Sequence, residues 1–126
     1  MKKTGVINTG SGKIRGYIGD GIQVFKGIPY AEPPIGDLRL SEPELKKPWD
    51  GVLEALKYKP VAPQPPPVTK FFPPPPQSEA DCLSINIWTP ACDNKKRPVM
   101  FWIHGGSHIY GSGRILNGRG LPLREI

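Results

Sequence analysis

Cysteine and long hydrophobic runs are both scarce in this chain of 126 residues. The two cysteines, Cys82 and Cys92, are followed by no others, which excludes a zinc-finger spacing and a disulfide framework. No stretch approaches the length of a transmembrane helix. The residues after Met1-Lys2-Lys3 lack the apolar region of a signal peptide. We therefore expect a soluble, cytoplasmic protein with no membrane partner.

Acidic residues are fewer than basic ones, which gives a formal net charge of +6 and an isoelectric point near 9.5. The basic clusters, Lys46-Lys47 and Lys95–Arg97, lie beside prolines in expected turns and are not interleaved with aromatic residues. Solvated loops explain such clusters better than a nucleic-acid surface. We expect no nucleic-acid partner.

Nucleotide and metal motifs are also absent. The chain contains no GxxxxGK[ST] loop and no GxGxxG motif. His104 and His108 lie in an expected turn with no acidic residue between them, which is a poor arrangement for a metal. The sequence therefore predicts neither a cofactor nor a metal site.

Proline and glycine, in contrast, are abundant, with 17 and 15 residues. Nine of the prolines fall between positions 60 and 76. Repeated proline is incompatible with a helix interior or a central strand. We therefore predict a proline-rich loop over residues 60–77 of a single domain, 1–126, whose foldable parts are 5–58 and 82–113.

Strand signals occur on both sides of this loop. Short β-type runs alternate with glycine turns over Gly5–Phe25, which is typical of a small antiparallel meander. Trp49–Leu53 is typical of a turn into a short strand. Ile85–Trp88 and Val99–Ile103 are predicted strands because β-branched and aromatic residues dominate them. The second is apolar throughout, as in a strand buried on both faces.

The apolar run ends at His104-Gly105-Gly106-Ser107. Glycine allows a sharp turn and lets a ligand approach the backbone closely. Such a loop at the end of a buried strand can bind a developing negative charge with backbone N–H groups. Alone, this motif is no more typical of such a site than of a plain glycine-rich turn.

Further strings give the loop a family context. Phe25–Arg39 is FKGIPYAEPPIGDLR, Ala80–Pro90 is ADCLSINIWTP, and Gly111-Ser112-Gly113 follows the loop. In order and spacing these motifs resemble the N-terminal portion of type B carboxylesterases, the family of the cholinesterases and of bacterial p-nitrobenzyl esterases. The resemblance covers nearly the whole chain. It implies an α/β fold, the N-terminal part of an α/β-hydrolase, with the meander preceding the first strands of an incomplete central sheet.

The resemblance also implies a reaction, the hydrolysis of a small-molecule carboxylic ester. In this family a serine attacks the ester carbonyl, a histidine transfers the proton and an acidic residue orients the histidine. The implied oxyanion-hole residues are Gly105, Gly106 and Ser107. Gly106 and Ser107 would donate their backbone N–H groups, and Gly105 would shape the loop. His104 and His108 would line the pocket.

The reactive half of this machinery has no counterpart in the chain. None of the serines has glycine at both the −2 and +2 positions; they are Ser11, Ser41, Ser78, Ser84, Ser107 and Ser112. In the family the nucleophile, acid and base lie further along the chain. We therefore assign no catalytic residue, and we expect an N-terminal fragment of a serine esterase that is inactive alone.

Two departures from the family pattern concern structural pairs. Alanine at position 80 replaces the glutamate that pairs with the arginine of the Leu-Arg segment in the family. Arg39 is therefore expected to pair with Glu79 or Asp81, or to stay unpaired. Alanine at position 62 stands where many secreted members have a cysteine, so Cys82 is predicted to be a free, buried thiol, which fits a reducing compartment.

Two binding functions stay open as alternatives. Phe72–Pro76 resembles the polyproline ligands of EVH1 domains, although Lys70 and Phe71 replace the acidic residue expected before it. A hydrolase-like adhesion domain without catalysis is the other alternative.

We expect the isolated chain to be poorly soluble or partly folded. The helices that cover an apolar strand such as Val99–Ile103 in an α/β-hydrolase would be missing, which leaves an aggregation-prone surface. Size-exclusion chromatography and thermal denaturation of the purified chain test this expectation. A cooperative transition in a monodisperse monomer would contradict it.

Overall fold

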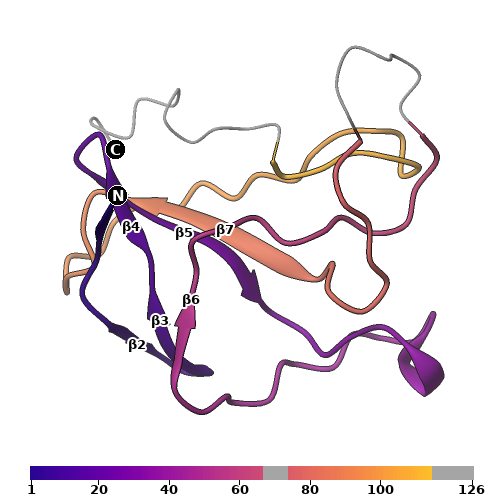
Figure 1. Ribbon diagram of the computed structural model, residues 1–126, viewed down its shortest axis with the longest axis horizontal. Helices are drawn as coiled ribbons and strands as arrows, with labels where there is room; N and C mark the ends of the chain where they lie inside the picture. The colour runs from indigo at the N-terminus through magenta and orange to yellow at the C-terminus, as the bar shows by residue number, and fades with distance from the viewer. Residues whose placement is uncertain (67–73, 115–126) are drawn as a thin grey trace.

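The structure describes residues 1–66 and 74–114 of the computed structural model, and their regular secondary structure consists almost entirely of short strands joined by long irregular segments (Figure 1). In these ranges the only helical element is the 3-10 turn η1 (Gly36–Leu38). One sheet has the strand order β1-β4-β5-β7 and the other has the order β2-β3-β6. The strands are β1 (Lys2–Lys3), β2 (Ile7–Thr9), β3 (Gly12–Arg15), β4 (Tyr17–Gly19), β5 (Ile22–Pro29), β6 (Val52–Glu54) and β7 (Ser84–Thr89).

The meander expected over Gly5–Phe25 is present, but it is divided between the two sheets. β2 and β3 form one antiparallel hairpin, and β4 and β5 form another. The chain changes sheets at Gly16, whose N–H donates to Oγ1 of the buried Thr4 and whose carbonyl accepts from the Thr4 N–H, both at 3.0 Å. A Cβ at Gly16 would lie 2.2 Å from the Val24 carbonyl oxygen, so this close approach of backbone requires glycine.

Strand β5 carries the bulge that joins the two sheets. Its antiparallel ladder with β7 shifts register between positions 25 and 28. In this stretch the Lys26 N–H donates to the Ala55 carbonyl at 2.8 Å, and the Gly27 N–H donates to Asn86 Oδ1 at 3.0 Å. Gly27 has a φ of +69°, which favours glycine. The bulge thus turns one backbone donor of β5 away from β7 and toward the segment after β6.

Strand β6 and the residue after it connect the second sheet to β5. β6 pairs in parallel with β3, and the Ala55 N–H donates to the Arg15 carbonyl at 2.8 Å. The predicted turn and short strand are confirmed here, and the Trp49 indole N–H donates to the Lys13 carbonyl at 3.0 Å. The buried core cluster consists of Ile14, Phe25, Ile28 and Ala55.

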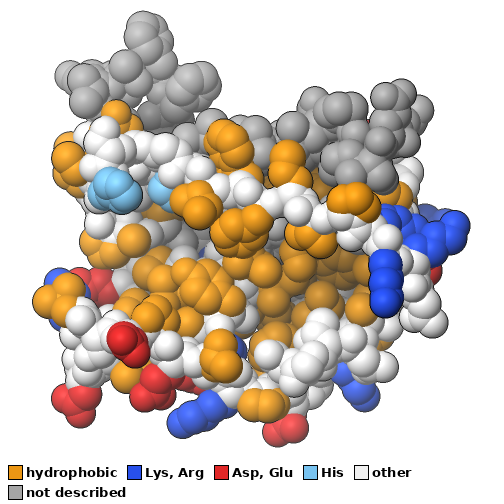
Figure 2. All heavy atoms as spheres, turned by 180° about the vertical axis from the view of Figure 1, so that it is seen from behind, with side chains coloured by type: hydrophobic (Ala, Val, Ile, Leu, Met, Phe, Trp, Pro, Cys, Tyr) orange, Lys and Arg blue, Asp and Glu red, His pale blue; other side chains and the backbone are white. Residues whose placement is uncertain are grey.

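The strand predicted over Val99–Ile103 is absent, and that prediction is wrong. These five side chains are between 52% and 88% exposed, and their backbone forms no ladder with any described residue. Apolar composition favours burial, but a strand also needs a hydrogen-bonding neighbour. β7, which confirms the strand predicted at Ile85–Trp88, pairs only with β5 in the described chain. Figure 2 shows hydrophobic side chains gathered across one face of the molecule.

The alternatives for Arg39 are resolved by two surface ion pairs. Arg39 Nη1 lies 2.7 Å from Glu79 Oε1, whereas Asp81 Oδ2 pairs with Lys59 Nζ at 2.9 Å. All four side chains are about a third or more exposed, so each pair contributes at most about 1 kcal/mol to stability. Their main effect is to tie the segment before β7 to two distant parts of the chain.

Gly27→Ala is expected to destabilise the fold by about 3 kcal/mol. Its Cβ would lie 2.7 Å from the Lys57 carbonyl oxygen, in a backbone conformation already unfavourable for alanine. Gly21→Ala is the matched control, because Gly21 has a φ of +77° but no atom within 4 Å of the new Cβ. It should cost about 1 kcal/mol. Pulse proteolysis in urea at low protein concentration measures the loss in free energy of unfolding for both variants. Equal losses in the two variants would contradict the close approach at the bulge.

Candidate functional site

The glycine-rich loop follows the extended segment 98–103 and closes in a tight turn. The Gly106 carbonyl accepts hydrogen bonds from the N–H groups of Ile109 at 3.0 Å and Tyr110 at 3.1 Å. The φ angles are +130° at Gly106, +55° at Ser107 and +59° at His108. Two consecutive left-handed residues with side chains are unfavourable, and such strain is frequent at functional turns.

The two glycines of the motif have different surroundings. A Cβ at Gly106 would lie 1.6 Å from the Tyr110 carbonyl oxygen, so the turn requires glycine at this position. A Cβ at Gly105 would meet nothing within 4 Å. Gly105 instead contributes its carbonyl oxygen, which lies 2.8 Å from His104 Nδ1 and against Gly111.

The N–H groups of Gly106 and Ser107 bind no atom among residues 1–66 and 74–114. The family resemblance implies these two groups as oxyanion donors, and they belong to consecutive residues of the chain. Successive unpaired N–H groups in a turn form a concavity that favours an anion. Gly106 is half-buried and Ser107 is exposed, so the described residues leave water free to reach the second donor.

The two histidines line the same cavity as the loop but form no metal cluster in the described chain. His104 contacts the Gly105 carbonyl, and His108 is exposed. Within residues 1–66 and 74–114, no group of three or more His, Cys, Asp or Glu side chains could hold a metal ion. Both histidines thus lie in the wall of this cavity, and their contact with a substrate stays a prediction.

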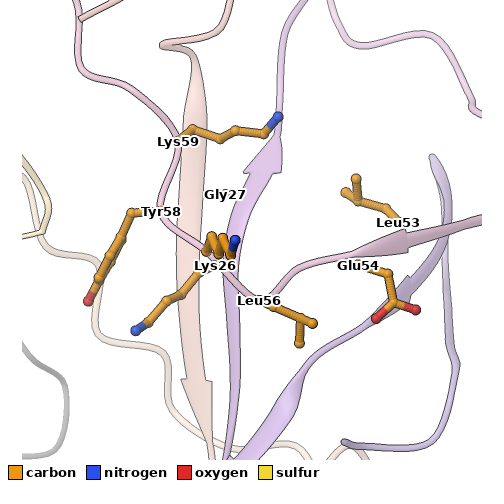
Figure 3. A pocket seen from close by; sticks show the side chains of 8 residues that line it. Lys26, Gly27, Leu53, Glu54, Leu56, Tyr58 and Lys59 are labelled. Carbon is orange, nitrogen blue, oxygen red and sulfur yellow. The ribbon is translucent and has the colours of Figure 1, made fainter. Parts of the chain in front are cut away.

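The described residues form a larger and a smaller cavity, and only the larger one contains the candidate site. The larger, of about 1120 Å³, lies between β7, the segment 58–64 and the segment 97–114, and it contains the whole glycine-rich loop in its wall. The smaller, of about 330 Å³, lies beside the β5 bulge (Figure 3). There the Lys26 ammonium lies 4.2 Å from the centre of the Tyr58 ring, a cation–π contact. Only the larger cavity includes the pair of unpartnered N–H groups.

Two glutamines that sequence patterns did not single out hold the far end of the loop. Gln64 Oε1 accepts from the Gly111 N–H at 2.8 Å, and Gln64 Nε2 donates to the Gly111 carbonyl at 3.1 Å. The Gln77 side chain in turn bonds to the backbone N–H and carbonyl of Gln64. No motif or periodicity marks these residues. Their only sequence signal is that they lie near the two ends of the proline-rich loop, residues 60–77.

Both cysteines are free, as predicted for Cys82. Cys82 is half-buried and not fully buried as expected, because its thiol lies near the surface segment that carries Glu79. Burial chiefly, with the negative charges of Asp81 and Glu79, raises the pKa of the Cys82 thiol. A protonated thiol is a poor nucleophile, so Cys82 is no candidate for acyl transfer.

Two remaining expectations concern partners. Phe72 lies outside the described residues, so the hypothesis of a polyproline ligand at Phe72–Pro76 stays a prediction. No helix within the described ranges is long and apolar enough to cross a membrane.

The arrangement of strands defines the class of protein first. A carboxylesterase from Geobacillus stearothermophilus matches this structure with a TM-score of 0.75 and 48% sequence identity, over 86% of this chain and 21% of that chain. A thermophilic p-nitrobenzyl esterase matches with a TM-score of 0.78 and 42% identity, over 86% and 23%. These neighbours are α/β-hydrolases, and the predicted fold class is confirmed: the chain holds part of an α/β-hydrolase fold, its described part rich in sheet.

Sequence comparison then gives the family. The model of the carboxylesterase family matches residues 3–125, so the chain belongs to that family, as the motifs predicted. Phenmedipham hydrolase of Pseudarthrobacter oxydans is 44% identical over 117 residues, and para-nitrobenzyl esterase of Bacillus subtilis is 38% identical over 109 residues. The matches cover 89% and 86% of this chain but only 24% and 22% of those proteins. The chain thus spans about a quarter of the length of these relatives.

Gly106→Ala is expected to open the turn. The new methyl group would collide with the Tyr110 carbonyl, so the amides of Ile109 and Tyr110 would lose their acceptor and exchange hydrogen roughly tenfold faster. Hydrogen–deuterium exchange mass spectrometry of peptides covering 104–112 measures this effect. Gly105→Ala, whose methyl group meets open space, is the control and should exchange like the unsubstituted chain. Equal exchange in the two variants would contradict the described turn.

Proposed function

We propose that this chain supplies the oxyanion-hole loop of a serine carboxylesterase that acts on a small-molecule carboxylic ester. The main support is the pair of backbone N–H groups at Gly106 and Ser107, which bind no atom of the described residues and lie in a turn that requires glycine at position 106. Membership of the carboxylesterase family supports ester hydrolysis as the chemistry. The two N–H groups would donate to the oxyanion of the tetrahedral intermediate, where their dipoles stabilise the developing charge.

Residues 1–126 alone are proposed to hydrolyse no ester. The chain has no serine in a nucleophile elbow, and its two histidines lie at the loop itself. An oxyanion hole without a nucleophile and a base has no tetrahedral intermediate to stabilise. The exposure of Ser107 adds to this, because a backbone dipole in contact with water acts far more weakly than one in a dry site. The activity therefore requires the remainder of the hydrolase architecture that the longer relatives contain.

A chimera tests the proposal. The segment of para-nitrobenzyl esterase from Bacillus subtilis that aligns with this chain is replaced by the matching residues of this chain. The chimera is expected to hydrolyse a p-nitrobenzyl ester. In the chimera Gly106→Ala should lower kcat by about 10²- to 10³-fold, as loss of an oxyanion donor does. Gly10→Ala, in the turn between β2 and β3, is the control and should leave kcat close to that of the parent chimera, because a Cβ at Gly10 meets nothing within 4 Å. The purified 126-residue chain should release p-nitrophenol from p-nitrophenyl acetate no faster than buffer.

Three outcomes would count against the proposal. Robust turnover by the 126-residue chain would show that it carries its own nucleophile. A folded chimera without turnover would favour the alternative of a hydrolase-like adhesion domain. Equal kcat values for the Gly106→Ala and Gly10→Ala chimeras would remove the oxyanion role from the turn.

A further inference from the structure

One side chain binds both backbone polar groups of a residue at the end of the glycine-rich loop. Gln64 Oε1 accepts from the Gly111 N–H at 2.8 Å, and Gln64 Nε2 donates to the Gly111 carbonyl at 3.1 Å. The same Nε2 donates to the Ala62 carbonyl at 3.1 Å, so both of its protons are used. The contact joins two segments that lie 47 positions apart in the sequence.

The chemistry of this contact requires a primary amide of this length. An amide offers an acceptor and two donors side by side. Glutamate would keep the acceptor for the Gly111 N–H but would place a negative charge against the Gly111 and Ala62 carbonyls. Methionine would fill similar space with no hydrogen bond of comparable strength. The identity of residue 64 is thus tied to the backbone of Gly111.

Gly111 in turn lies against the two residues that precede the oxyanion donors. A Cβ on Gly111 would lie 2.4 Å from the Gly105 carbonyl oxygen and 2.4 Å from His104 Nδ1. On its other side, the preceding Tyr110 N–H donates to the Gly106 carbonyl at 3.1 Å. A shift of Gly111 toward the loop would therefore displace His104 and Gly105, because that side of Gly111 has no room even for a methyl group.

Gln64 is itself held in place by Gln77, at the other end of the proline-rich loop. Its backbone N–H donates to Gln77 Oε1 at 3.0 Å, and Gln77 Nε2 donates to the Gln64 carbonyl at 3.1 Å. Two backbone bonds extend the same pairing, from the Val61 N–H to the Pro76 carbonyl and from the Ser78 N–H to the Val61 carbonyl, both at 2.9 Å. Val61 is buried, which anchors this flank against the rest of the fold.

We propose that Gln64 is a positioning residue for the oxyanion hole, and that Gln77 holds it in place. This inference rests on the proposed function of the loop. Gln64 touches neither substrate nor reacting atoms; it acts through Gly111 on the orientation of the Gly106 and Ser107 N–H groups. A misplacement of about 1 Å in a catalytic geometry can cost up to a hundredfold in rate.

The first test measures local order in the chimera, in which the remainder of the esterase accompanies this chain. Gln64→Met and Gln64→Glu should each speed hydrogen exchange in peptides covering 105–112 by roughly tenfold, since two hydrogen bonds are lost or opposed. Gln77→Met should have a smaller effect, because it leaves the Gly111 contacts in place. Gln23→Met on β5 is the matched control variant and should leave exchange at 105–112 unchanged. In both Gln64 variants, exchange in peptides of β4 and β5 should also stay the same.

The second test is kinetic and uses the chimera. Gln64→Met and Gln64→Glu should lower kcat by roughly ten- to a hundredfold with little change in KM, because the oxyanion exists only beyond the ground state. Gln23→Met should leave both constants unchanged. A residue with a merely structural role would instead lower the amount of folded enzyme, or change KM, without a selective loss of kcat per folded molecule.

The outcomes separate this inference from the proposed function. If Gly106→Ala lowers kcat but the Gln64 variants do not, the loop is the oxyanion hole and the positioning role is wrong. If Gly106→Ala has no effect on kcat, the proposed function fails, and hydrogen exchange alone decides whether Gln64 orders the loop. Unchanged exchange at 105–112 in Gln64→Met overturns the inference in either case. Retention of full kcat by Gln64→Glu would also overturn the inference. A side chain of similar size would then be enough to position the loop, without the amide donor.

Discussion

The rest of the structure depends on the bulge in β5 at Lys26 and Gly27. Strand β5 must pair with β7 on one edge while a donor from the same strand reaches the segment after β6. The extra residue at the bulge conflicts with the β7 ladder, because it leaves one backbone N–H of β5 without a backbone partner on β7. The left-handed Gly27 and the side-chain oxygen of Asn86 resolve the conflict. Through this irregularity the two sheets enclose one core, and β7 takes a fixed place on its edge.

The candidate site lies outside this core and is stabilised in a different way. β7 forms one wall of the larger cavity, but the glycine-rich loop opposite it makes no strand pairing in the described chain. The loop depends on glycine at position 106, on its own turn bonds and on the amide of Gln64. Hydrophobic burial thus holds the scaffold, whereas hydrogen bonds and backbone conformation hold the site. This division is expected where a loop must keep its N–H groups free for a ligand.

The sequence predicted what local patterns determine and missed what depends on distant partners. The hairpins, β7 and the turn at Trp49 follow from alternation and turn residues, and they are present. The change of sheet at Gly16 depends on a bond to Thr4, which no local pattern announces. Val99–Ile103 has the composition of a buried strand, but composition specifies a preference for burial and not a hydrogen-bonding neighbour. No local pattern marks Gln64, because its bond to Gly111 forms only when the fold brings residue 111 beside it.

The central claim is that the backbone N–H groups of Gly106 and Ser107 bind the oxyanion, and the most direct measurement is crystallographic. A chimeric esterase carrying this chain can be inhibited with a p-nitrophenyl phosphonate, whose tetrahedral phosphonyl group on the active-site serine mimics the intermediate. The account predicts the phosphonyl oxygen within about 2.7–3.1 Å of both nitrogens. A phosphonyl oxygen that points away from the turn, or that is bound only by other groups of the enzyme, would contradict the account.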